Sequence, residues 1–331
     1  MRRCTAVIHL TPRWLFALLF VYAAAAGAGA GADAGPTGLD LPDAPLPQLP
    51  VTQVSDHVYA AIGATEAPTR ENLGHNNNLS FIVTSAGVVV VNGGDNAYLA
   101  AALHAAIRRI TTAPVIAVFN ENGQGHAFLG NAYWADQGVP IFAHRDALAE
   151  VEAHGEVALQ QMRERMGELA AGTRVVVPQP LGDFERLVYG NTVIEVYRFG
   201  AAHSPGDISL WLPQERIVIA GDIAFHERLL GIFPDSDVFG WIESFDELAA
   251  LEPKVVIPGH GSPTDIETVR HYTQGYLRYL QEQIEIVLDE GGDLNDAYAI
   301  DQSAYSHLDT FEELAQKNVG RLYRQMEMEL F

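Results

Sequence analysis

Cysteine is nearly absent from this chain of 331 residues. The single cysteine, Cys4, lies ahead of an apolar run close to the N-terminus. If the N-terminal segment with Cys4 is cleaved off, the remaining protein contains no cysteine, so disulfides cannot stabilise it. Its stability must then come from the hydrophobic core and from any metal that it binds.

Lysine is also scarce, and negative charge dominates. The sequence contains two lysines, Lys254 and Lys317, and its formal net charge is -22. Such a surface repels phosphate backbones and anionic lipid headgroups, which disfavours nucleic acids and membrane surfaces as partners. We therefore expect a small-molecule substrate and no nucleic-acid partner, and the oligomeric state stays open. Hydrophobic residues make up 48% of the chain, which argues against global disorder.

The first residues have the layout of a secretory signal peptide. Three arginines (Arg2, Arg3 and Arg13) precede an apolar run at 14–22 that is short for a membrane span, and an Ala/Gly stretch follows. Candidate cleavage sites are Ala28-Gly29-Ala30 and Ala32-Asp33-Ala34. We predict a signal peptide over 1–32, a Pro/Gly-rich linker over 33–50, and a periplasmic or secreted protein without membrane insertion after cleavage. An uncleaved N-terminal anchor is the alternative.

Short apolar runs that are typical of strands alternate with helical patterns from His57 onwards. The predicted strands cover 79–84, 88–91, 114–119, 140–143, 174–177, 186–189, 192–199, 208–212, 216–220 and 255–258, and the predicted helices cover 97–110, 145–171 and 242–250. Two such halves, each with loops at one edge, predict a layered α/β/β/α sandwich.

A helical segment follows at 264–331. Two capping-box patterns, Thr264 with Glu267 and Thr310 with Glu313, predict the starts of two helices there. The glycine pair Gly291-Gly292 predicts the end of the first helix. The apolar stripes of these helices predict packing against the sandwich. The alternative is that the segment also covers the mouth of a functional site.

The run at 120–126, Asn-Glu-Asn-Gly-Gln-Gly-His, follows a predicted strand and precedes an apolar helix start. Later strands also lead into glycine-containing loops with an imidazole or a carboxylate, at His203, Asp222 and His260. Loops at the ends of adjacent strands converge, and glycine lets the backbone turn sharply beside each side chain. Such side chains are ligands for zinc, and also for iron or manganese.

This order of elements, over roughly residues 51–261, resembles the metallo-β-lactamase superfamily, whose signature at the first loop reads H-x-H-x-D-H. His126 matches the final histidine, Glu121 replaces the first, and Gly123 and Gly125 replace the second histidine and the aspartate. The resemblance implies an α/β fold, namely a four-layer αββα sandwich over residues 51–263, with residues 264–331 as a C-terminal helical extension.

The resemblance also implies a metal site with fewer ligands than usual. The second metal pocket would keep His126, Asp222 and His260, and the first would keep His203 with Glu121. Two histidines and a carboxylate with open positions form a workable catalytic set. We therefore expect zinc, one ion in preference to two, while iron and manganese stay open.

These features predict an exported metal-dependent hydrolase in which water activated at the metal attacks an ester, lactone, amide or thioester bond. Asp222 and Glu121 would be catalytic, with Glu121 either a replacement ligand or a general base that accepts a proton from that water. The alternatives are a non-catalytic pseudoenzyme that binds a small ligand on the same fold, and an iron redox enzyme.

Four further residues are candidates for supporting roles. Asp207 would orient His203 through a hydrogen bond. Asn92 would support the motif loop, although a simple turn at the end of a strand is an equal alternative. His75 and His226 could contact the substrate.

Overall fold

The computed structural model describes residues 39–329. The predicted signal peptide and the linker residues 33–38 lie outside the described part of the chain. Within the described part, no helix is both long enough and apolar enough to cross a membrane.

A seven-stranded mixed sheet forms the first half of the fold, and its strands follow one another in chain order. The strands are β1 (Thr52–Gln53), β2 (Val58–Ala61), β3 (Leu79–Thr84), β4 (Gly87–Val91), β5 (Val115–Phe119), β6 (Ile141–His144) and β7 (Gln179–Leu181). Pairing is antiparallel from β1 to β4 and parallel from β4 to β7.

A five-stranded sheet in the order β12-β11-β10-β9-β8 forms the second half. Its strands are β8 (Phe184–Tyr189), β9 (Thr192–Tyr197), β10 (Ser209–Leu212), β11 (Ile217–Phe225) and β12 (Val255–His260). Strands β11 and β12 are parallel, and their register shifts between Ile219 and Gly221 and again before Phe225. Such a bulge re-aims side chains next to a site.

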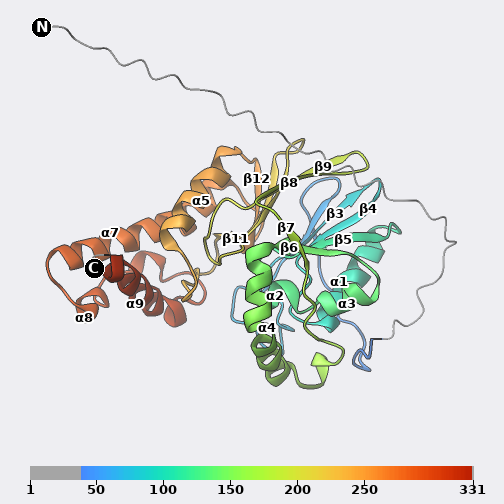
Figure 1. Ribbon diagram of the computed structural model, residues 1–331, viewed down its shortest axis with the longest axis horizontal. Helices are drawn as coiled ribbons and strands as arrows, with labels where there is room; N and C mark the ends of the chain where they lie inside the picture. Colours follow the sequence, from blue (N-terminus) through green and yellow to red (C-terminus); the bar gives the residue numbers. More distant parts are fainter. Residues whose placement is uncertain (1–38, 330–331) are drawn as a thin grey trace, which may run out of the picture. The chain divides into compact units, whose positions relative to one another are not determined.

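The strands and helices are arranged in layers (Figure 1), and side-chain alternation in the strands accounts for them. In β4, Val88 and Val90 pack in one cluster with Leu103 of helix α1 (Ala97–Ile110), whereas Val89 packs with Ile194 of the second sheet. Successive residues of a strand point to opposite faces, so an all-apolar strand such as β4 is buried on both. The predicted αββα sandwich is confirmed.

Helices cover both outer faces. On the side of the first sheet, α1 is joined by α2 (Gly125–Phe128), α3 (Asn131–Asp136) and α4 (Arg145–Met166), which a short 3₁₀ turn (Gly167–Ala170) follows. Helix α5 (Val238–Ala250) packs on the second sheet through Trp241 and Phe245, in one cluster with Val218 of β11.

The C-terminal segment packs against the sandwich, as predicted. It contains α6 (Ile266–Val269), a π-helical turn (Arg270–Gln274), α7 (Gly275–Asp289), α8 (Leu294–Ala297), a 3₁₀ turn (Ser303–Tyr305) and α9 (Phe311–Glu329). Tyr276, Leu280 and Leu322 belong to the same buried cluster as α5. Figure 1 shows α7, α8 and α9 beside α5, on the side away from α1 to α4.

Two sequence predictions of secondary structure are wrong. Residues 173–178 form no strand, and the strand of this region is β7, at Gln179–Leu181. The long helix stops at Met166 because Gly167 adopts a positive φ of 59°. Glycine tolerates this conformation and commonly ends helices.

Both predicted capping boxes are also wrong. Thr264 pairs with Val256 in a β-bridge, so Asp265 caps α6 and its side chain accepts a hydrogen bond from Thr268 N. The Thr310 hydroxyl donates to Leu229 O instead of capping α9. In both cases a tertiary contact overrides the local pattern.

Candidate metal centre

Four loops or strand ends bring imidazole and carboxylate groups together around Asp222. The motif loop leaves β5, the His203 loop follows β9, Asp222 lies within β11, and His260 ends β12. The side chains of these residues are buried or nearly so, with exposures of 0% for Asp222, 3% for His203, 6% for His260 and 13% for His126. The structure therefore unites four residues that the sequence predicted as ligands.

Asp222 is the centre of this group. Its Oδ2 lies 3.3 Å from His126 Nε2 and 3.6 Å from His203 Nδ1, while its Oδ1 lies 3.4 Å from His260 Nε2. Glu121, whose side chain is 2% exposed, places Oε1 3.4 Å from His126 Nε2. Ligand atoms of Glu121, His126 and Asp222 all lie within 4.8 Å of one another.

Two glycines make room for the carboxylates. A Cβ at Gly221 would overlap with Glu121 Oε2, and a Cβ at Gly259 would overlap with Asp222 Oδ1. Gly221 also has a φ of 62°, a backbone conformation that residues other than glycine rarely adopt. Both positions require glycine, because any side chain there would displace a carboxylate from the centre.

The buried charges shift one another's pKa values. Burial alone would lower the pKa of His126, but Asp222 and Glu121 outweigh it and raise that pKa to about 10. Burial raises the pKa of Glu121, and the charge of Asp222 raises it further. Burial would also raise the pKa of Asp222, yet the three imidazoles around it lower that pKa. In the metal-free protein the buried carboxyl groups therefore favour the protonated, cationic form of His126.

A network of buried amides supports the same carboxylates. Asn77 Nδ2 donates to Glu121 Oε1 at 2.7 Å and to Asp222 Oδ1 at 3.1 Å. Asn92 Nδ2 donates to Asn77 Oδ1 at 2.9 Å, and Asn92 Oδ1 accepts a hydrogen bond from Glu121 N at 3.0 Å. Asn92 thus holds the motif loop, which agrees with its expected role. Asn77 was not foreseen, because an asparagine in an Asn-rich loop carries no distinguishing pattern.

Asp207 does not orient His203 as predicted. Its carboxylate accepts hydrogen bonds from Ser204 N at 2.6 Å and from Ser204 Oγ at 2.9 Å. These groups lie within four consecutive residues, so Asp207 stabilises the turn that carries His203. Among the described residues, no hydrogen bond joins Asp207 to the His203 imidazole. Burial raises the pKa of Asp207 well above its usual value.

The two residues predicted to contact substrate face backbone carbonyls. His75 Nε2 lies 3.3 Å from Ala61 O, and burial lowers the pKa of His75 to about 4. His226 Nε2 lies against Ser262 O. Neither contact involves Asp222, so these histidines brace the loops around the centre.

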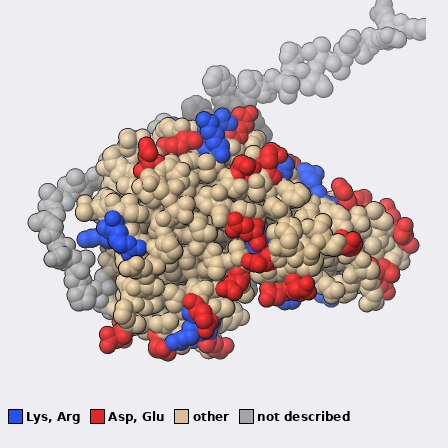
Figure 2. All heavy atoms as spheres, turned by 180° about the vertical axis from the view of Figure 1, so that it is seen from behind, with Lys and Arg blue, Asp and Glu red and all other residues tan. Residues whose placement is uncertain are grey.

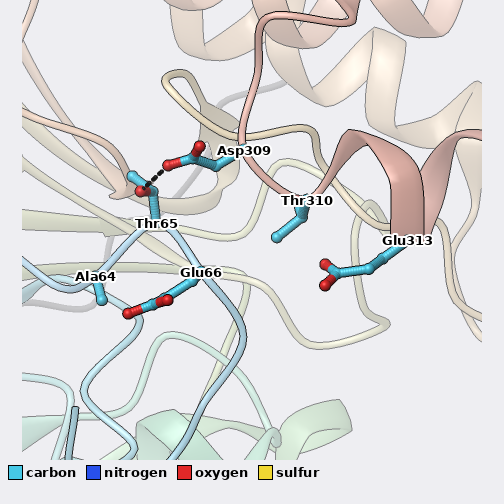
Figure 3. A pocket seen from close by; sticks show the side chains of 6 residues that line it. All are labelled: Ala64, Thr65, Glu66, Asp309, Thr310 and Glu313. Atoms are coloured by element: carbon cyan, nitrogen blue, oxygen red, sulfur yellow. Dashed lines mark hydrogen bonds between the residues drawn. The ribbon is translucent and has the colours of Figure 1, made fainter. Parts of the chain in front are cut away.

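A cavity of about 400 Å³ lies on the side of Arg228 away from His260 (Figure 3). It lies between the loop at 64–66 and the start of α9, and its lining residues are Ala64, Thr65, Glu66, Asp309, Thr310 and Glu313. Arg228 links it to the centre, because Nη1 lies 3.4 Å from His260 Nδ1 and 3.5 Å from Glu66 O. The C-terminal segment therefore contributes one wall of this cavity.

The residues present fit a metal ion of the zinc type. Ligands at about 2.0–2.2 Å from a tetrahedral zinc lie roughly 3.3–3.6 Å from one another. The separations of 3.3 Å and 3.4 Å from His126 Nε2 to Asp222 and Glu121 match that range. The same nitrogen is buried and has no hydrogen-bond partner among the described residues. An imidazole nitrogen that lies between two carboxylates without a well-aligned hydrogen bond is an arrangement in which a metal cation can replace the proton.

Comparison with known proteins agrees with this geometry. The family model of the metallo-beta-lactamase superfamily matches residues 126–260, a span that starts at His126 and ends at His260. The chain belongs to the metallo-β-lactamase superfamily. A curated metallo-beta-lactamase type 2 from Bacteroides fragilis is 24% identical over 244 residues, which cover 70% of this chain and 86% of that protein.

Solved structures with low sequence identity share the fold. A metallo-beta-lactamase from Pontibacter korlensis has a TM-score of 0.57 at 19% identity and covers 70% of this chain and 99% of that chain. A sec-alkylsulfatase from Pseudomonas sp. has a TM-score of 0.64 at 17% identity and covers 83% of this chain and 50% of that chain. Since 83% of 331 residues is about 275, the latter similarity extends beyond residue 263 into the C-terminal segment.

Side-chain positions favour a register of the superfamily signature one residue later than the sequence suggested. A Cβ at Gly123 would lie 2.6 Å from Glu150 Cβ and 2.7 Å from Ala147 O, so position 123 faces helix α4. Asn122 and Gln124, by contrast, reach Asp222 and His203. The signature H-x-H-x-D-H then corresponds to the run from Asn122 to Ala127, with His126 at the aspartate. Both registers assign His126 to the second pocket.

Sequence reasoning missed Asn122 and Gln124. Their place in the loop between β5 and α2, directly before His126, was a usable signal, because loops at strand ends carry functional side chains. Gly123 and Gly125 were instead aligned with the second histidine and the aspartate of the signature, which placed the motif one residue too early.

Proposed function

We propose that this protein is a metal-dependent hydrolase that works with one metal ion. Glu121, His126 and Asp222 would hold the ion, and His260 would approach it from the Oδ1 side of Asp222. The observation that carries the proposal is His126 Nε2, which is buried, lacks a hydrogen-bond partner and lies at ligand spacing from two carboxylates. Zinc suits this set of imidazole and carboxylate ligands best.

The chain's own residues would arrange the reaction. A zinc ion in this position supplies Lewis acidity, which polarises a scissile group and acidifies water. Asn77 and Asn92 hold Glu121 in place, which supports its role as a ligand over its role as a general base. Arg228 places a cation beside His260, on the side of the cavity, where it can attract an anionic substrate.

The substrate class we propose is a small molecule with an ester, lactone, amide or thioester bond. The relatives named as β-lactamases support amide chemistry, and the alkylsulfatases among them add sulfate esters to the compounds worth testing. Acidic side chains are spread over the face in Figure 2, where the basic ones stand apart from one another. This distribution supports a small-molecule substrate over a polyanion. The N-terminal pattern supports export to the periplasm or beyond.

Metal binding by the purified protein tests the proposal. The protein is freed of metal with a chelator and titrated with zinc by calorimetry, alongside His126→Ala and the control His307→Ala, an exposed histidine of the C-terminal segment. We expect about one equivalent for the wild type and the control, and a loss of more than about 100-fold in affinity for His126→Ala. Less than about half an equivalent in the wild type would contradict the proposal.

Glu121→Gln separates the two roles of Glu121. A ligand role predicts that zinc affinity falls at least about tenfold, whereas a base role predicts unchanged affinity with a rate reduced by about 100-fold or more. A protein that binds zinc but hydrolyses none of the bond types above would instead fit the ligand-binding alternative.

A further inference from the structure

The loop at 226–237, which joins β11 to α5, carries an exposed aromatic ring beside the candidate metal centre. Phe233 is 40% exposed, and its ring meets the His203 imidazole edge-on, with centroids 5.2 Å apart. The rings of Phe225 and Trp241 also contact this imidazole, but both are buried. Of these three rings, only that of Phe233 can therefore be contacted from solvent.

Helix α9 of the C-terminal segment holds this loop. Asn318 Oδ1 accepts a hydrogen bond from Ile232 N at 2.8 Å, and Arg321 donates to Ile232 O. The guanidinium carbon of Arg321 lies over the Phe233 ring, 5.4 Å from its centroid. A cation over an aromatic face is attracted to the ring, so Arg321 stabilises this position of Phe233. Asn318 and Arg321 are three residues apart and therefore share one face of the helix.

Ser236 connects the same loop to His203. Its hydroxyl accepts a hydrogen bond from Phe233 N at 2.9 Å and donates to His203 O at 2.7 Å. Gln325 of α9 donates to Ser236 O at 3.3 Å. Backbone hydrogen bonds, in addition to the ring contact, therefore fix Phe233 beside His203.

Phe233 differs from an ordinary exposed phenylalanine. Single exposed apolar residues are common on protein surfaces, and Phe184 on the edge strand β8, with 49% exposure, is an example in this chain. Phe233 instead contacts the imidazole whose Nδ1 lies 3.6 Å from Asp222 Oδ2. An apolar group of a molecule bound at the centre can therefore gain free energy by covering this ring.

We propose that Phe233 is a substrate-contact residue that binds an alkyl or aryl group next to the scissile bond, and that Arg321 of α9 is a positioning residue for it. This inference rests on the proposed metal-dependent function and narrows its substrates to compounds with an apolar group beside that bond. It also gives the C-terminal segment a part in substrate selection, through the hydrogen bonds and the ring contact described above.

Binding of hydroxamic acids to the zinc-loaded protein tests the inference without reliance on activity. The hydroxamate group chelates zinc, so the attached alkyl chain probes the surroundings of the ion. Calorimetry compares acetohydroxamic acid with octanohydroxamic acid, for the full wild-type chain, for Phe233→Ala and for the matched control Phe184→Ala. We expect the longer compound to bind the wild type and the control at least about 30-fold more tightly than the shorter one, and this ratio to fall at least about tenfold in Phe233→Ala.

Arg321→Gln tests the positioning role. The ratio of the two affinities should fall at least about threefold, while the affinity for acetohydroxamic acid stays within about twofold of the wild-type value. Arg321→Lys should restore part of the ratio, because it keeps a cation and a hydrogen-bond donor. An equal loss for both compounds would show that Arg321 supports the structure in general and would remove it from the proposal.

Each remaining result has a distinct meaning. A wild type that binds zinc but gains no affinity with chain length, or binds neither hydroxamic acid, overturns the inference and leaves the metal-dependent function standing. An unchanged ratio in Phe233→Ala does the same. A wild type that binds no zinc overturns the proposed function and the inference with it. Phe233→Gln covers the case in which Phe233→Ala does not fold, because it keeps much of the side chain's bulk and should lower the ratio likewise.

Discussion

Asn77→Ala is the sharpest test of how the centre is held together. Asn77 is 1% exposed, and its amide bridges the two buried carboxylates Glu121 and Asp222 while accepting a hydrogen bond from Asn92. Alanine keeps the backbone but removes both donors and the acceptor. Two carboxylates would then face each other with less compensation, and the Asn92 amide would lose a partner.

The magnitude follows from the three bonds. A hydrogen bond to a charged group contributes about 1.5–3 kcal/mol, and a buried amide left without its partner costs about 1–3 kcal/mol. Burial and the nearby charge raise the pKa of Glu121, so the bond to Glu121 lies at the lower end. We expect Asn77→Ala to lower the free energy of unfolding of the metal-free protein by at least about 4 kcal/mol at neutral pH.

Guanidinium unfolding of the chelator-treated protein measures this loss. The matched control is Asn76→Ala, because Asn76 is also buried and its one hydrogen bond among the described residues comes from its backbone N–H. We expect that control to lose less than about 1 kcal/mol. Glu121→Gln in the Asn77→Ala background should recover part of the loss, since it removes one of the two charges. Equal losses for Asn77→Ala and Asn76→Ala would refute this account of the centre.

Three further predictions concern single residues. The pKa of His126 is raised from 6.5 to about 10, so the metal-free protein should lose up to about 1.4 kcal/mol of stability per pH unit as pH rises between these values, and His126→Gln should flatten that slope in unfolding curves. The pKa of His75 is lowered to about 4, so stability should fall as pH drops from 6.5 towards 4, and His75→Asn should remove that part of the acid sensitivity. Gly221→Ala should abolish zinc binding, because its Cβ would displace Glu121. Gly138→Ala, with a similar φ of 72° and open space around it, should cost only about 1 kcal/mol of stability and keep zinc binding. Normal zinc affinity in Gly221→Ala would show that Glu121 is no ligand.

Much of the fold could be predicted because its strands are apolar on one or both faces. The run of valines in β4 and the apolar β11 are buried throughout, and such runs identify core strands without further information. The loop at 173–178 failed for the opposite reason. It contains three consecutive valines, yet residues 173–178 pair with no strand, since the chain reaches the edge of the sheet only at β7.

The candidate site could be predicted in part. His126, His203, Asp222 and His260 stand after strands in the sequence, and the sheet edges bring them together. Asn77 could not be recognised, because it reaches the centre from the loop between β2 and β3 through tertiary structure alone. Asparagine is common in loops for local reasons, so its identity carries no such information.

The neutral amides around Asp222 have a consequence for the charge of the centre. Replacing Asn77 or Asn122 by a carboxylate would add a negative charge beside the buried carboxylates Glu121 and Asp222, close to which the positive charges are those of His126 and Arg228. Amides instead satisfy the oxygens of Asp222 without altering the net charge: Asn77 donates to Oδ1 and Asn122 to Oδ2. A divalent cation that replaces the His126 proton would therefore gain electrostatic energy from Asp222 and would favour the ionised form of Glu121.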